Sequence, residues 1–109
     1  MTLTATTRFL TLSAAFLAAS LSMGSALADD KLAKEKNCLA CHAIDKQLVG
    51  PSYQAVAKKY AGQKDAVDKL ALKIIKGGAG AFGPVPMPAN PQVNEADAKK
   101  LAAWIMATK

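Results

Sequence analysis

Three stretches in the second half of the chain repeat apolar residues at the spacing of an amphipathic α-helix. The first follows Ser52, a favourable N-cap residue, and stops at Gly62. Two lysines, Lys58 and Lys59, fall on its outward side. Its apolar stripe consists of Tyr53, Val56, Ala57 and Tyr60. The pattern predicts a helix of about two turns.

The second and third stretches show the same spacing with their own start and stop signals. One begins near Asp65 and ends at Gly77-Gly78; the other has Asn94 as N-cap and Asp97 three residues later, a variant of the capping box. Their apolar stripes consist of Val67, Leu70, Ala71 and Ile74, and of Ala98, Leu101, Ala102 and Ile105. We expect Met106 to extend the buried face of the last helix.

An earlier helix is predicted from about Asp30 into the Cys38 region, because LAKEK favours helix and acidic residues suit its first turn. Residues 43–50 read as a loop that ends at Gly50-Pro51. The segment 77–91 holds four glycines and four prolines, so it is neither helix nor regular strand. Since no alternating β pattern or internal repeat is visible, the sequence predicts an all-α domain.

The N-terminal segment has the pattern of a secretory signal peptide. Arg8 supplies a positive charge, an apolar run covers residues 9–21, and Ala26-Leu27-Ala28 fits a cleavage site. An uncleaved membrane anchor is the alternative, but the run is short for a bilayer span. We expect residues 1–28 to be a cleaved signal peptide, and residues 29–109 to be one exported domain.

The composition of residues 29–109 limits both fold and partners. Thirteen lysines and eight acidic residues leave a formal charge of +5, with no arginine. A domain of 81 residues has a small core and benefits from an internal staple. A positive charge can attract either nucleic acid or an acidic protein. Because the chain is expected to be exported and this part of it has no arginine, the charge indicates an acidic protein partner.

The strongest chemical signal is the five-residue segment Cys38-Leu39-Ala40-Cys41-His42. C-x-x-C-H is the attachment pattern of a c-type haem. Two thiols at this spacing can form thioethers to neighbouring vinyl groups, and the histidine can bind the iron through a neutral ring nitrogen. Haem attachment of this kind takes place outside the bacterial cytoplasm, which agrees with an exported domain.

Other uses of the two cysteines fit less well. A thioredoxin-like pair expects a βαβ context, and a zinc site expects four ligands, whereas the chain has two Cys and one His. A disulfide between Cys38 and Cys41 would leave the adjacent histidine unexplained. We therefore predict one covalently bound haem c, which would also act as the staple.

The second axial ligand is predicted to be Met87. It lies between Pro86 and Pro88 in a stiff, non-helical segment, where a thioether has no packing role at helical spacing. Met106 lies on a helical stripe and is assigned to the core. Ligation by His42 and Met87 would raise the reduction potential.

The predicted domain resembles the small bacterial class I cytochromes c, in particular the cytochrome c-551 (cytochrome c8) group. The segments that carry the resemblance are CLACHAID, VGP, KKYAGQ, IIKGG and FGPVPMPANPQV, in matching order and spacing. The resemblance implies a class I cytochrome c fold of about four helices around the haem, with the terminal helices crossing. It also implies that the carbonyl of Pro51 accepts a hydrogen bond from His42.

One position departs from the family pattern. Phe82 stands where the family often has tryptophan, so the hydrogen bond of an indole to a haem propionate is in doubt. Trp104 is expected to pack in the core or against the haem.

The expected function is one-electron transfer in the periplasm, between components of respiration or denitrification. The partners implied are nitrite reductase, cytochrome c oxidase or peroxidase as acceptors, and a quinol-oxidising cytochrome complex as donor. We expect a monomer that does not insert stably in the membrane after cleavage. The alternatives are a small haem peroxidase or gas sensor with a labile sixth ligand, and a haem-free, disulfide-bonded interaction protein.

Overall fold

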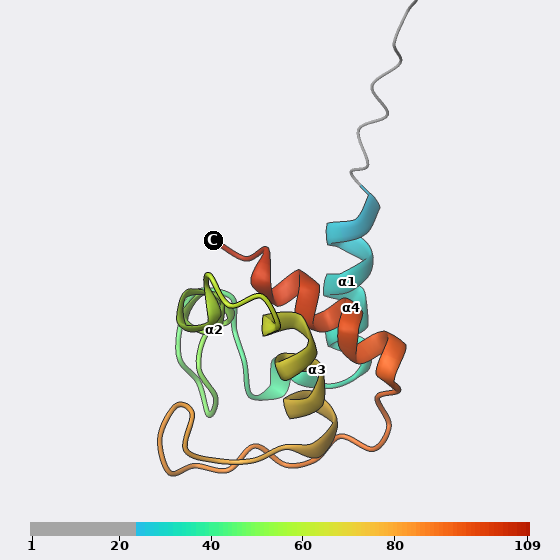
Figure 1. The fold of residues 1–109 in the computed structure, drawn as a ribbon. Helices are drawn as coiled ribbons and strands as arrows, with labels where there is room; N and C mark the ends of the chain where they lie inside the picture. The colour runs from blue at the N-terminus through green and yellow to red at the C-terminus, as the bar shows by residue number, and fades with distance from the viewer. Residues whose placement is uncertain (1–23) are drawn as a thin grey trace, which may run out of the picture.

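The described part of the chain, residues 24–109 of a computed structural model, consists of four α-helices and one short 3₁₀ turn joined by loops (Figure 1). The elements in order are α1 (Gly24–Glu35), η1 (Cys38–Ala40), α2 (Tyr53–Tyr60), α3 (Ala66–Lys76) and α4 (Glu95–Met106). The all-α prediction is confirmed. Arg8 and the apolar run over residues 9–21 lie outside the described residues.

Helix α1 differs from the predicted first helix at both ends. It begins at Gly24 rather than near Asp30, so it passes through the predicted cleavage site. It also stops before the cysteines, because Asn37 has φ 62° and turns the chain out of the helical path. Asparagine adopts this left-handed conformation more readily than most residues.

Helices α2 and α3 lie where the apolar spacing predicts them. The hydroxyl of Ser52 accepts a hydrogen bond from the amide of Ala55 at 3.1 Å and caps α2. Helix α3 ends at Lys76, and Gly77 follows with φ 69°, a conformation that disfavours side chains. On α3 the first buried residue is Ala66, while Val67 is half-buried against the core.

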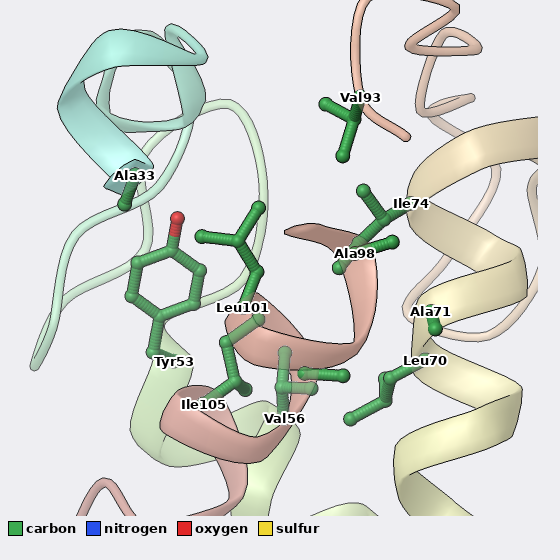
Figure 2. Packing of buried hydrophobic residues seen from close by; sticks show 11 residues of the cluster. Ala33, Tyr53, Val56, Leu70, Ala71, Ile74, Val93, Ala98, Leu101 and Ile105 are labelled. Atoms are coloured by element: carbon green, nitrogen blue, oxygen red, sulfur yellow. The ribbon is translucent and has the colours of Figure 1, made fainter. Parts of the chain in front are cut away.

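Helix α4 is the centre of the core, since it packs against each of the other three helices of the described chain (Figure 1). Asn94 caps it by accepting a hydrogen bond from the amide of Asp97 at 2.8 Å. All four residues of its predicted stripe are buried. Figure 2 shows side chains of α2 and α3 converging on α4 around Leu101, which is 1% exposed.

The terminal helices meet at a small residue. Ala33 of α1 is fully buried, so its methyl group allows the two backbones to approach closely. Lys36, just after α1, forms an ion pair with Asp97 of α4 at 3.5 Å. In the described chain, no helix is long and apolar enough to cross a bilayer.

Candidate functional site

Cys38 and Cys41 lie in a tight turn that brings their side chains together. The amides of Cys41 and His42 both bond to the carbonyl of Cys38, at 3.2 and 3.1 Å. In a 3₁₀ turn, residues three apart lie one above the other, so both sulfur atoms project to the same side. Both thiols are free and half-buried, and both line one cavity.

The ring of His42 is held in one orientation by its surroundings. Its Nδ1 lies 2.7 Å from the carbonyl oxygen of Pro51. Because a carbonyl only accepts, Nδ1 donates this hydrogen bond, and Nε2 is the ring nitrogen left to face a metal ion. The ring of Tyr53 stacks on the imidazole, with centroids 5.2 Å apart and planes at 20°. Pro51 and Tyr53 thus fix the orientation of the His42 ring.

Gly50 leaves the space that this ring occupies. A Cβ atom at position 50 would lie 2.4 Å from Cε1 of His42, well inside van der Waals contact. The Gly50 amide also donates to the carbonyl of Cys41 at 2.8 Å, which holds the loop against the motif. In the sequence, Gly50 is marked only as the end of a loop and as part of the VGP segment. The Gly50-Pro51 pair that follows the predicted ligand His42 is the signal that the sequence offers.

Met87 stands at the closing end of a loop pinned to the end of α3. The amide of Gly78 donates to the carbonyl of Met87 at 2.9 Å, and the amide of Met87 donates back at 2.8 Å. At Gly77 a Cβ would overlap the carbonyl oxygen of Met87. This position therefore requires glycine for the two segments to meet. The Met87 side chain is half-buried and lines the same cavity as the cysteines.

Asn90 joins the same loop to α3 and was missed from the sequence. Its side-chain amide donates to the carbonyl of Ile74 at 2.9 Å, and its backbone amide donates to that of Ile75 at 3.1 Å. Carbonyls in the last turn of a helix lack partners within the helix, so Asn90 satisfies two of them. The loop that carries Met87 thus also caps α3.

The cavity has a volume of about 410 Å³ and is lined mainly by apolar surface, with a few charged side chains. Leu70, Ile74, Leu101 and Ile105 contribute apolar walls from α3 and α4. Among the residues that the structure describes, no acidic one lines the cavity, but Lys36 and Lys73 do. Two thiols, an imidazole and a thioether on one apolar cavity are the donor set of a covalent haem, and the lysines suit its carboxylates. The residues therefore fit this group.

Burial changes the acidity of two groups beside the motif. Desolvation raises the pKa of the Cys38 thiol above its ordinary value. Desolvation, followed by the charge of an ionised Cys38, raises the pKa of the Tyr53 phenol. Tyr53 also meets Trp104 edge to face, with centroids 5.0 Å apart. Trp104 is thus a packing residue of the wall behind His42.

Two other residues considered from the sequence, Met106 and Phe82, lie in different places. Met106 packs against the core and is not among the residues that line the cavity. Phe82 lines the cavity but remains 42% exposed, and the ammonium group of Lys59 lies over its ring. Of the two methionines in the described part of the chain, Met87 thus lies at the cavity and Met106 lies in the core.

Comparisons with known proteins agree with this geometry. The cytochrome c family profile matches residues 26–109. Cytochrome c-552 of Hydrogenobacter thermophilus is 58% identical over 87 residues, covering 79% of this chain and 87% of that protein. Cytochrome c-551 of Azotobacter vinelandii is 54% identical over 80 residues, covering 73% and 96%. The crystal structure of Nitrosomonas europaea cytochrome c552 superposes with a TM-score of 0.72 at 48% identity, covering 73% of this chain and 99% of that one.

Proposed function

Because the chain belongs to the cytochrome c family, we propose that it carries single electrons in the periplasm with an iron held by His42 and Met87. The chain is a small c-type haem electron carrier with one covalently bound haem c, not an enzyme. We propose further that the haem is attached through Cys38 and Cys41. The axial ligands, the periplasmic location and the named partners are likewise proposals.

The observation that carries the proposal is the convergence of four donors on one cavity. Cys38 and Cys41 would hold the haem by thioethers, and His42 would offer Nε2 while Pro51 keeps its ring in place. Met87 would offer a neutral sulfur from a loop fixed to α3. A bound haem iron would supply the chemistry by cycling between its ferric and ferrous states. With both axial positions filled by side chains, substrate would find no open site.

The export and partner proposals rest on the sequence and on charge. The family match begins at residue 26, close to the predicted cleavage after Ala28. Five of the eight acidic residues are paired with lysines in the described chain, so the surplus charge comes from other lysines. We propose acidic redox proteins as partners: nitrite reductase, cytochrome c oxidase or peroxidase downstream, and a quinol-oxidising cytochrome complex upstream.

An optical spectrum of the exported protein tests the ligands. Wild type should show a low-spin haem with the weak far-red band of thioether-to-iron ligation when oxidised. Met87→Ala should abolish that band, lower the potential and open the iron to added ligands. Met106→Leu is the matched control and should change none of the three, since it is a near volume-conserving core substitution.

If the two variants behaved the other way round, Met106 rather than Met87 would be the sixth ligand. A five-coordinate, high-spin reduced spectrum with carbon monoxide binding in wild type would favour a peroxidase or gas sensor instead. Extraction with acidified acetone tests the thioethers separately: haem that leaves with the solvent contradicts attachment at Cys38 and Cys41.

A further inference from the structure

The loop that carries Met87 has a second attachment to the protein, at its far end. Residues 80–83, here called the loop tip, form a turn in which the amide of Gly80 donates to the carbonyl of Gly83 at 2.9 Å. The ammonium group of Lys59, from the last turn of α2, donates a hydrogen bond to the carbonyl of Ala81. The same nitrogen lies 4.7 Å from the centroid of the Phe82 ring.

These two contacts act on consecutive residues through a single charged group. A carbonyl oxygen and the face of an aromatic ring both present negative charge, so one ammonium can satisfy both. The Phe82 side chain has no polar atom, so the cation meets the face of its ring. The side chain of Lys58, the preceding residue on α2, is exposed and makes no hydrogen bond or ion pair within the described residues. The contact is therefore specific to Lys59.

The position of this contact matters because the base of the loop is already fixed. Gly78 and Met87 are joined by their pair of backbone hydrogen bonds, and Asn90 holds the following residues to α3. Residues 79–86 between these points lie largely in solvent. Without an anchor at the tip, this segment could swing about its base (Figure 1), and this motion would pull on the hydrogen bonds between Gly78 and Met87 that hold Met87 in place.

We propose that Lys59 and Phe82 form a tip clamp, and that Lys59 is a positioning residue for Met87. By tying the loop tip to α2, the clamp restricts outward motion of residues 79–86 and slows departure of the Met87 sulfur from the iron. This role rests on the proposed ligation by Met87. Helix α2 would then help to hold Met87 in place through Lys59, although none of the residues of α2 would bind the iron.

The test compares four single variants and one double variant, Lys59→Met with Phe82→Leu, of the haem-loaded protein. Lys59→Met keeps the length of the stem and removes the cation, Lys59→Arg keeps a cation, and Phe82→Leu removes the ring. Lys58→Met is the matched control on the same helix. Two quantities are measured: the rate at which imidazole displaces the sixth ligand of the oxidised protein, and hydrogen exchange of the Gly80 amide.

Lys59→Met should accelerate both imidazole binding and exchange of the Gly80 amide by roughly fivefold to tenfold, because the lost cation–π contact and hydrogen bond are both exposed and only partly felt at Met87. Lys59→Arg should return both to within about twofold of wild type. Lys58→Met should leave both unchanged. Phe82→Leu should have a smaller effect in wild type and almost none in the Lys59→Met background, because the ring acts through the cation.

Equal rates in Lys59→Met and Lys58→Met would overturn the clamp. Additive effects of Lys59→Met and Phe82→Leu would overturn the coupling between cation and ring. Failure of the clamp is distinguishable from failure of the proposed function. A wild-type protein without the far-red thioether band counts against Met87 as ligand. Unchanged Gly80 exchange with that band intact counts against the clamp alone.

Discussion

At the scale of single residues, the missing side chain at position 50 decides where the imidazole of His42 can lie. Gly50→Ala would place a methyl group 2.4 Å from Cε1, so either the ring or the loop must move. We expect a loss of roughly 1–3 kcal/mol in the free energy of unfolding, as for overpacked sites, and an altered haem spectrum. Denaturant unfolding and the Soret band of the haem-loaded protein measure the two effects.

Gly62→Ala separates backbone strain from the contact with His42. Gly62 has φ 79°, so alanine is strained there, but its Cβ would meet nothing within 4 Å. This variant should lose roughly 1 kcal/mol and keep the wild-type spectrum. An unchanged spectrum in Gly50→Ala would show that the loop, rather than the histidine, absorbs the clash.

Tyr53 gives a prediction for alkaline solution. Burial raises the pKa of its phenol above the ordinary value of about 10, so the folded protein keeps a proton that the unfolded chain loses. The free energy of unfolding should therefore fall as the pH rises above about 10, by up to about 1.4 kcal/mol per pH unit from this residue. Below about pH 10 the phenol is protonated in both the folded and the unfolded chain, so Tyr53 causes no loss of stability there.

Tyr53→Phe should remove this part of the alkaline loss. Denaturant unfolding near pH 9 and near pH 11 provides the comparison, with the half-buried Tyr60 changed to Phe as control. Equal pH slopes for Tyr53→Phe and wild type would mean that the phenol ionises without unfolding the protein.

The sequence marks the four candidate donors far more clearly than the residues that surround them. Cys38, Cys41 and His42 form a contiguous pattern, and Met87 is marked by its two flanking prolines. Gly50 and Asn90 act through contacts with His42 and with α3, which no local pattern encodes. Ligands can be recognised by residue type and spacing, whereas supporting residues depend on which segments meet in space.

At the scale of elements, the loop after α3 both carries Met87, the proposed sixth ligand, and caps the helix, so damage to one role should affect the other. Asn90→Ala removes the donor to the Ile74 carbonyl. The expected loss is about 1–2 kcal/mol in the free energy of unfolding, together with a weaker far-red thioether band. Thermal unfolding and the optical spectrum of the haem-loaded protein measure both.

Asn90→Asp is the sharper variant, because it keeps the shape of the side chain and replaces the donor by an acceptor. It should destabilise at least as much as Asn90→Ala, since an anionic oxygen would face the Ile74 carbonyl. Gln63→Ala, at an exposed side chain between α2 and α3, should stay within about 0.5 kcal/mol of wild type. A stable Asn90→Asp variant would contradict the capping role.

Helix positions followed from the apolar spacing, while the ends of the first helix did not. Helices α2, α3 and α4 have strong stripes and clear caps, and the structure agrees with them closely. Helix α1 has a weak stripe, and its end depends on the left-handed backbone of Asn37. A single backbone angle is not visible in hydrophobic periodicity, so the break between α1 and the motif was missed.

At the scale of the whole molecule, the excess of lysine should govern how fast partners are met. A formal charge of +5 on residues 29–109 attracts an acidic redox protein over a distance set by salt. We expect the second-order rate of electron exchange with such a partner to fall at least about fivefold between roughly 0.01 M and 0.1 M ionic strength. Stopped-flow mixing across a salt series measures it.

Two substitutions identify which surface property controls the rate. Lys46→Ala removes one exposed charge, and Val49→Ala trims an apolar residue that is 64% exposed at the edge of the cavity. Steering by charge predicts that the lysine variant reacts more slowly at low salt and like wild type at high salt. A rate nearly independent of salt, and slowed more by Val49→Ala, would instead indicate docking through apolar contact.

The two sides of the cavity are each assembled from a short, continuous piece of chain. The cysteine turn, His42 and its support by Pro51 lie within residues 38–53, and the Met87 loop with its contacts to α3 lies within residues 74–90. Between them, residues 61–65 are exposed throughout. A peptide-bond cut there would give two fragments that each keep one complete half of the site, so reassociation of the fragments on haem could report how the halves find each other.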